Sequence, residues 1–148
     1  MSESSEKLVT HVVAARGAIA PVENSAPAIM AAGAELLARV TEANGISEAD
    51  AVFCLFTASP GLNAAYPATG ARRHGWTSTP LMSAVEVDVP GGISGCIRLL
   101  LTYQRLVPAG TTAAEAKAQV RHIYLGEAAK LRPDWAAATS GAKERKES

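Results

Sequence analysis

Arg98 is the residue whose position most directly indicates chemistry, because its neighbours in the sequence are apolar. It lies in the run Cys96-Ile97-Arg98-Leu99-Leu100-Leu101, which has the composition of a β-strand. An arginine stays charged in proteins, so a guanidinium in such a strand needs a carboxylate or phosphate partner. Glu86 lies on the other side of Pro90-Gly91-Gly92, and a hairpin centred near Gly92 would place it opposite Arg98 on one sheet face.

Two interpretations of this arginine and glutamate stay open at this point. The pair can be a structural ion pair between strands, or it can mark an anion-binding pocket with an acid on its wall. Other chemistry has less support, because the three histidines and two cysteines lack the spacing of metal ligands or of a redox motif. We find no phosphate-binding loop, dinucleotide-binding motif or serine-hydrolase motif. We therefore expect no metal, no cofactor and two reduced cysteines in the core.

The composition predicts one folded domain. The chain has 148 residues, of which 48% are hydrophobic and 19% charged. Basic and acidic residues both number 14, so the formal net charge is zero, which argues against binding to nucleic acid or to an anionic membrane. No apolar run approaches membrane-spanning length, and residues 1–6 carry no basic cluster. We expect a soluble, cytoplasmic protein.

The first half of the chain predicts a strand, a long helix and a second strand. Residues 9–15 are rich in strand formers and lead into a predicted loop that carries Arg16. A helix is expected from Pro27 to just before Gly45. Residues 51–56 are apolar on both faces and predict a central strand. The Gly- and Pro-rich segment 59–75 follows, with a short helix beginning at Pro67, and we expect it to contribute to a site.

The second half predicts two more strands and a final helix. Strands are expected at residues 81–89 and 97–103. Thr112 and Glu115 form a capping box, which predicts a helix that passes through Val120 and Tyr124. The resulting fold class is α/β, with a mixed α+β sheet packed with helices in a single domain over residues 1–136. Residues 137–148 are rich in Ala, Ser and Lys and predict a mobile tail.

From about residue 12 to residue 134, the sequence resembles the monofunctional AroH-class chorismate mutases. No single motif is diagnostic, but their order and spacing are typical of that family. The segments that carry the resemblance are Arg16-Gly17-Ala18, Tyr66-Pro67-Ala68, Gly75-Trp76, Glu86-Val87-Asp88-Val89, Cys96-Ile97-Arg98, Arg121-His122-Ile123-Tyr124-Leu125 and Leu131-Arg132-Pro133-Asp134. The resemblance implies a homotrimer assembled as a pseudo-α/β-barrel, with each site between two subunits.

The resemblance also implies an activity, the intramolecular Claisen rearrangement of chorismate to prephenate in the biosynthesis of phenylalanine and tyrosine. Such an enzyme needs no cofactor, because it holds the compact conformer of its substrate and stabilises the charges that develop as the ether bond breaks. By the same resemblance, Arg98 and Glu86 are the catalytic residues. The substrate-binding residues implied are Arg16, Tyr66, Ala68, Arg72, Leu81, Ser83, Tyr124, Leu131 and Arg132.

Two positions depart from a well-known form of the family pattern. Ser83 stands in place of a Cys, and Thr69 in place of a Lys. A serine can still bind the ring hydroxyl of the substrate, whereas loss of the lysine removes an attraction for a dianion. Ser83 and Glu86 are also an odd number of residues apart, so a regular strand would send them to opposite faces. Both can reach one ligand only if the chain bulges or leaves the strand near Ala84.

Two alternative functions are compatible with the sequence. One is a binding or structural trimer that has kept the fold without useful turnover. The other is an imine or enamine deaminase of the RidA type, in which a similar fold also uses arginine to bind a carboxylate. A chorismate turnover assay separates these possibilities.

Overall fold

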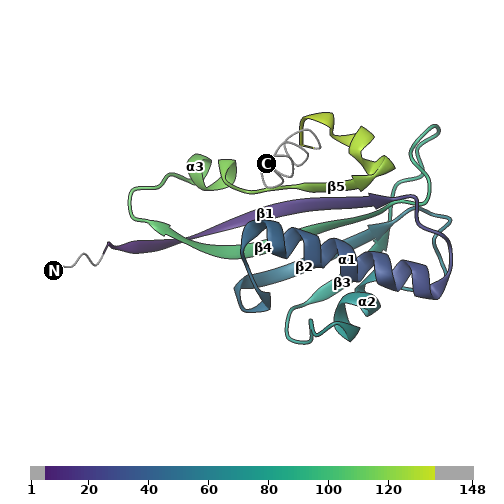
Figure 1. Cartoon of the computed structure of the whole chain (residues 1–148), viewed down its shortest axis with the longest axis horizontal. Coiled ribbons are helices and arrows are strands. Elements are labelled where there is room, and N and C mark those ends of the chain that lie inside the picture. Colours follow the sequence, from purple (N-terminus) through teal and green to yellow (C-terminus); the bar gives the residue numbers. More distant parts are fainter. Residues whose placement is uncertain (1–5, 136–148) are drawn as a thin grey trace, which may run out of the picture.

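A computed structural model describes residues 6–135, which form one five-stranded sheet with its longest helix packed along one side (Figure 1). The strand order is β3-β2-β4-β1-β5. The strands are β1 (Leu8–Ala20), β2 (Ala51–Ala58), β3 (Leu81–Val85), β4 (Ile97–Pro108) and β5 (Ile123–Gly126). The helices are α1 (Ala26–Asn44), α2 (Pro67–Arg73) and α3 (Ala113–Ala118), with short 3-10 turns η1 (Glu48–Asp50) and η2 (Glu127–Leu131).

The sheet is mixed, as predicted. β4 runs antiparallel to both β1 and β2, whereas β5 is parallel to β1 and β3 is parallel to β2. β2 has neighbours on both sides and is therefore a central strand, which the apolar run predicted. The predicted mobile tail lies outside the described residues. Within residues 6–135, no helix has the length and apolar character needed to cross a bilayer.

α1 begins and ends where its local sequence predicts. The Ser25 hydroxyl accepts a hydrogen bond from the Ala28 N–H at 3.2 Å, and Pro27 lies in the first turn. Gly45 ends the helix with φ of 63°, a left-handed conformation that costs glycine little. The buried face of α1 includes Ile29, Leu36 and Val40, which join the main core on the sheet. These capped ends make the helix predictable without tertiary information.

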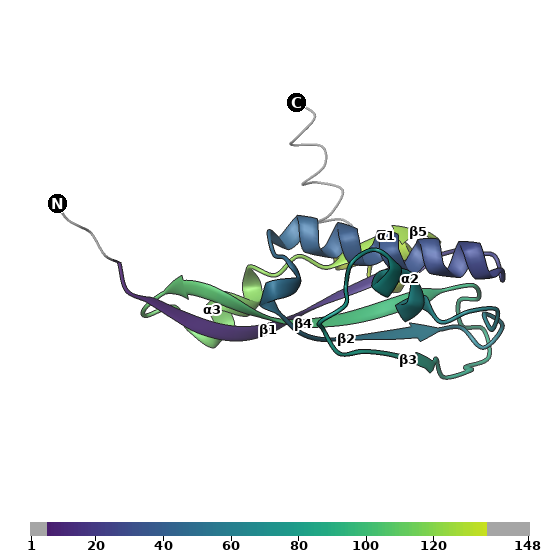
Figure 2. The same ribbon diagram turned by 90° about the horizontal axis from the view of Figure 1, so that it is seen from below.

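α2 packs against α1 at unusually close range, because small residues face each other. A Cβ atom at Gly70 would overlap the backbone carbonyl of Met30, and one at Gly33 would overlap that of Pro67. Figure 2 shows α1 running above the sheet in the edge-on view, with α2 beside it. The two glycines thus set how near α2 comes to α1, and so fix the segment that carries Arg72.

The predicted loop at Arg16 is wrong, because β1 continues through this residue to Ala20. Arg16, Gly17 and Ala18 all pair with β4. A Cβ atom at Gly17 would come within 3.0 Å of side-chain atoms of Leu36 and Val40. Glycine is therefore used here to let α1 approach the strand, not to turn the chain.

The predicted helix through Tyr124 is also wrong. The capping box of Thr112 and Glu115 is present, but α3 ends at Ala118. Tyr124 lies in β5, where it pairs with Ala18 of β1. The stretch before and around it is rich in β-branched and aromatic residues, and the free edge of β1 provides a partner strand, so pairing outweighs local helix propensity. The strand predicted at residues 81–89 ends early at Val85, and the one predicted at 97–103 continues to Pro108.

The face of the sheet opposite α1, called the open face below, is apolar and mostly exposed, and within residues 6–135 η2 covers it only at the β5 edge. Alternate residues of β2 point to the two faces: Cys54, Phe56 and Ala58 are buried toward the helices, whereas Phe53 is 40% exposed. Register places further exposed side chains on the same open face, namely Val12 of β1, Met82 of β3 and Leu106 of β4. A half-covered sheet with such a row of apolar side chains is typical of a surface that another chain covers.

Candidate active site

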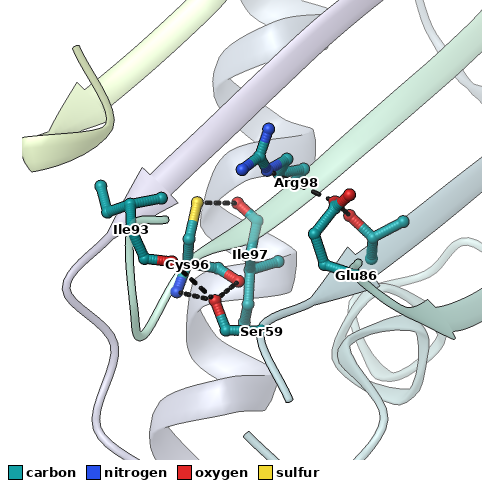
Figure 3. Close-up of polar contacts among 7 residues, drawn as sticks. Ser59, Glu86, Ile93, Cys96, Ile97 and Arg98 are labelled. Carbon is teal, nitrogen blue, oxygen red and sulfur yellow. Dashed lines mark hydrogen bonds and ion pairs between the residues drawn. The ribbon is translucent and has the colours of Figure 1, made fainter. Parts of the chain in front are cut away.

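Arg98 and Glu86 meet on the open face of the sheet. Arg98 lies on β4 directly opposite Thr57 of β2. Glu86 follows the last residue of β3, and its N–H donates to the carbonyl of Ala58 at 2.8 Å, which holds it beside β2. The Arg98 Nε atom then lies 3.4 Å from Glu86 Oε2, as the facing side chains in Figure 3 show. Both side chains are partly exposed, at 25% and 31%.

This contact confirms the predicted pairing but not the predicted hairpin. β2 lies between β3 and β4, so Glu86 and Arg98 do not belong to neighbouring strands. The residue that fills the space is Thr57, whose hydroxyl donates to Glu86 Oε2 at 2.8 Å. Sequence reasoning missed Thr57. The available signal was that it supplies the only hydroxyl group in the apolar segment Ala51–Ala58.

The guanidinium of Arg98 is not saturated by Glu86. The Nε atom is buried and has no hydrogen-bond partner among the described residues, because the 3.4 Å ion pair lacks hydrogen-bond geometry. A charge-assisted hydrogen bond between arginine and carboxylate normally measures about 2.7–2.9 Å. Arg98 can therefore still donate to an anionic ligand.

Arg16 and Tyr124 lie on the same face, next to Arg98. Ala18 pairs with Arg98 on one side and with Tyr124 on the other, so the tyrosine lies one strand beyond β1. Tyr124 is only 4% exposed, and within residues 6–135 its buried hydroxyl has no hydrogen-bond partner. Burial raises the pKa of Tyr124, and the positive charges of Arg16, Arg132 and Arg98 oppose that shift. The hydroxyl is consequently a protonated donor at neutral pH.

Arg16, Glu86 and Arg98 line a small pocket of about 110 Å³ on the open face, whereas Tyr124 lies outside its lining. Its lining residues are Arg16, Leu55, Thr57, Glu86, Arg98, Leu99 and Leu100. A larger hollow of about 530 Å³ lies beside it, under the loop between β3 and β4, and shares Glu86 and Arg98 with the first. Two arginines and one carboxylate on a partly apolar wall suit a small, anionic organic ligand.

The base of that loop is fixed by Ser59, another residue that sequence reasoning did not identify. Its hydroxyl accepts from the Cys96 N–H at 2.9 Å and lies 3.3 and 3.4 Å from the carbonyls of Cys96 and Ile93 (Figure 3). The Ser59 N–H donates to the same Cys96 carbonyl at 2.9 Å. Ser59 thereby joins the end of β2 to the start of β4, two residues before Arg98.

The remaining predicted site residues fall into two groups that do not line either pocket. The first group lies on or near α2 and β3 and consists of Tyr66, Ala68, Arg72, Leu81 and Ser83. β3 is regular up to Val85, so Ser83 faces the helices while Glu86 faces the open side. The Ser83 hydroxyl accepts from the Ala68 N–H at 3.3 Å, and Tyr66 is 71% exposed.

The second group is at the C-terminal end of the described chain. Leu131 packs with Tyr124 in a small second core. Arg132 forms an ion pair with Asp134 at 3.0 Å, and its guanidinium carbon lies 3.4 Å above the ring of Trp135. This group packs against the same small core as Tyr124, whereas the first group is on the other face of the sheet.

Comparison with known proteins decides the family. The family model described as chorismate mutase type I matches residues 12–135. The chain belongs to the chorismate mutase type I family. As a member, it is an isomerase that converts chorismate to prephenate. This assignment removes the imine deaminase alternative.

Individual chorismate mutases agree over most of the chain. Chorismate mutase AroH of Thermus thermophilus is 42% identical over 120 residues, which are 80% of this chain and 92% of that protein. Chorismate mutase AroH of Bacillus subtilis is 35% identical over 120 residues, which are 80% of this chain and 88% of that protein. The solved chorismate mutase from Clostridium thermocellum superposes with a TM-score of 0.66 at 38% identity, covering 78% of this chain and 96% of that one.

Proposed function

We propose that the pocket around Arg98 holds chorismate while it rearranges to prephenate. Chorismate carries two carboxylates, an enol ether oxygen and a ring hydroxyl, and the reaction has no covalent enzyme intermediate. The enzyme must hold the compact conformer and stabilise negative charge on the ether oxygen and positive charge on the ring. The unsatisfied Nε atom of Arg98 is the observation that carries the proposal, since it offers a preorganised donor on the pocket wall.

In this proposal Arg98 donates to the ether oxygen and to a substrate carboxylate together. A planar guanidinium has several donors in a fixed arrangement, so one group can serve both acceptors. Glu86 faces the ring hydroxyl and the positively charged ring fragment. Its hydrogen bond from Thr57 supports this role, because the hydroxyl holds the carboxylate in place without neutralising it.

Arg16 and Tyr124 bind a carboxylate of the substrate in the same scheme. The buried hydroxyl of Tyr124, which has no hydrogen-bond partner among residues 6–135, supports this role, as does the position of Arg16 on the pocket wall. Leu131 and Arg132 are proposed to close the pocket from the C-terminal side. Their support is the packing of Leu131 with Tyr124.

We further propose that the active assembly is a homotrimer with a site between each pair of subunits. The open apolar face supports this, because Val12, Phe53, Met82 and Leu106 stay exposed on it, whereas the C-terminal segment covers its edge at β5. The group on α2 and β3 is then contributed by the adjacent subunit, with Tyr66, Ala68, Arg72, Leu81 and Ser83 as its binding residues.

Cys54 and Cys96 are buried and free, which suits a reducing compartment such as the cytoplasm.

The test of this proposal follows chorismate loss by ultraviolet absorbance for the wild-type protein and for three changes at Arg98. Arg98→Ala should lower kcat by at least about 10²–10³, or roughly 2.7–4 kcal/mol, as for loss of one preorganised donor. Arg98→Lys should recover little, since it keeps the charge without the planar set of donors. Citrulline at the same position, introduced by semisynthesis, keeps the shape and some donors but removes the charge.

The citrulline protein separates binding from catalysis. Near-normal KM with a collapsed kcat would mean that the positive charge acts on the transition state. Turnover near that of the wild-type protein, with the fold intact by circular dichroism, would leave Arg98 as a structural partner of Glu86. A well-folded wild-type trimer without turnover would instead favour the binding-protein alternative.

A further inference from the structure

His122 connects the strand that carries Arg16 to the C-terminal segment. It lies immediately before β5, whose pairing with β1 begins at Ile123 opposite Gly17. The Arg16 N–H donates to Nδ1 of His122 at 3.0 Å. A side chain, and not a strand carbonyl, therefore accepts this hydrogen bond at the point where β5 starts.

The other side of the imidazole is covered by an aromatic side chain. The rings of His122 and Trp135 stack with centroids 3.8 Å apart and planes 26° from parallel. Arg132 lies over the same indole at 3.4 Å and forms an ion pair with Asp134. Residues 132–135 thus pack as a unit against the histidine, and the same Trp135 ring lies 5.9 Å from that of Tyr124.

The hydrogen bond fixes the protonation state of the ring. Because Nδ1 accepts, the bonded imidazole is neutral and carries its proton on Nε2. A proton on Nδ1 would face the Arg16 N–H, which is also a donor, and the hydrogen bond would be lost. The pKa of His122 is lowered by burial and by the positive charges of Arg132 and Arg16, while Asp134 opposes the shift. Among residues 6–135, these three charged groups act on the ring from β1 and from residues 132–134.

We propose that neutral His122 is a positioning residue for substrate binding. It holds the backbone of Arg16 through its hydrogen bond and the Trp135 segment through ring stacking, and it lies two residues before Tyr124 in the chain. The inference rests on the proposed role of Arg16 and Tyr124 in binding a substrate carboxylate. Arg98 lies on β4 and Glu86 just after β3, away from this anchor, so its loss should affect KM more than kcat.

Two substitutions separate the hydrogen bond from the stacking. His122→Phe keeps an aromatic ring for Trp135 but removes the acceptor, and it should raise KM roughly tenfold, the value of about one hydrogen bond. Its kcat should stay within about twofold of the wild-type value, since Arg98 and Glu86 are unchanged. His122→Asn removes the ring but places an amide oxygen near the position of Nδ1, so it should retain more of the affinity.

The pH dependence of KM gives a readout that a purely structural role would not change. The folded-state pKa of His122 lies below its ordinary value of about 6.5, so the anchor is intact at neutral pH and is lost as the pH falls through that folded pKa. Wild-type KM should rise over this range, whereas KM of His122→Asn should not. Substrate carboxylates titrate alike in both experiments, so the difference between the two pH profiles reports His122.

Three outcomes would overturn the inference or its basis. An unchanged KM in His122→Phe would overturn it, as would identical pH profiles for the wild-type and His122→Asn proteins. Arg16→Ala serves as the reference: a raised KM there with a normal KM in His122→Phe removes only the role of His122. A normal KM in Arg16→Ala would remove the proposed role of Arg16 and the inference with it. If His122→Phe folds poorly in a thermal melt, the pH profile of His122→Asn still decides.

Discussion

The contact between Arg98 and Glu86 is longer than a hydrogen bond between an arginine and a carboxylate. Arginine and carboxylate side chains favour a close pair with two parallel hydrogen bonds, which would use up the donors of Arg98. Here the Thr57 hydroxyl donates to Glu86 Oε2 at 2.8 Å, and the Arg98 Nε atom lies 3.4 Å from the same oxygen. The threonine therefore keeps the two catalytic candidates apart and available.

This arrangement predicts a specific effect of removing the Thr57 hydroxyl. Thr57→Val keeps the size and β-branching of the side chain, so the strand should fold normally. Glu86 is then free to pair closely with Arg98, and kcat should fall about tenfold, in keeping with loss of one hydrogen bond to a charged group. The measurement is steady-state kinetics of chorismate loss together with a thermal melt.

The matched control for this change is Thr57→Ser, which keeps the donor and should keep most of the activity. Full activity in Thr57→Val would contradict the separating role and leave Thr57 as a packing residue. A loss of activity in both variants would point to the methyl group and to packing of β2.

The charge in an apolar strand was a reliable sign of the site, but the sequence could not supply its geometry. Arg98 needed a partner for physical reasons that hold in any fold, so its pairing with Glu86 could be predicted. Thr57 could not be found in the same way, because it becomes relevant only once β2 inserts between β3 and β4. Their spacing in the sequence indicates that Ser83 and Glu86 cannot face the same side of a regular strand. The structure has a regular strand here, so the two side chains lie on opposite faces of the sheet.

The two helices on the sheet depend on glycine at their contact. Gly70→Ala would add a Cβ atom that overlaps the carbonyl of Met30, and a backbone carbonyl cannot move aside as a flexible side chain can. We expect a loss of about 1–3 kcal/mol in the free energy of unfolding, typical of overpacking, despite the better helix propensity of alanine. Urea denaturation measures this difference.

Gly61→Ala is the control, since nothing lies within 4 Å of a Cβ atom there. It should change the unfolding free energy little. Equal stability of Gly70→Ala and the wild-type protein would mean that α2 can shift away from α1 at no cost. In that case α2 would not hold Arg72 in a fixed position.

The elements that the sequence predicted well are those specified by nearby residues. α1 has a serine cap, an early proline and a terminal glycine, so its bounds follow from local physics. β5 has only four residues and exists because β1 offers it an edge, a partner from the other end of the chain. No local pattern reports such a pairing, and the capping box before it pointed toward a helix.

One chain holds only part of the proposed binding site. Arg16, Glu86, Arg98 and Tyr124 lie on the open face, whereas Ser83 and the residues of α2 lie on the covered one. No movement of a regular sheet brings both faces to one ligand. The proposed trimer resolves this division, because the open face of one subunit can meet the α2 edge of the next, and closed symmetry would generate three equal sites.

Mixing two impaired variants tests that division directly. Arg98→Ala should disable one half of each site and Arg72→Ala should weaken the other half. In randomly mixed trimers, obtained by joint unfolding and refolding in equal amounts, about one quarter of the sites combine an intact Arg98 with an intact Arg72 from the neighbour. Activity of the mixture should therefore exceed the mean of the two parents and reach about a quarter of the wild-type value, or more if Arg72→Ala retains partial function. Light scattering on the same sample should give the mass of three chains.

Activity equal to the parental mean, or an active monomer, would place both arginines in the site of one chain and reject a shared pocket.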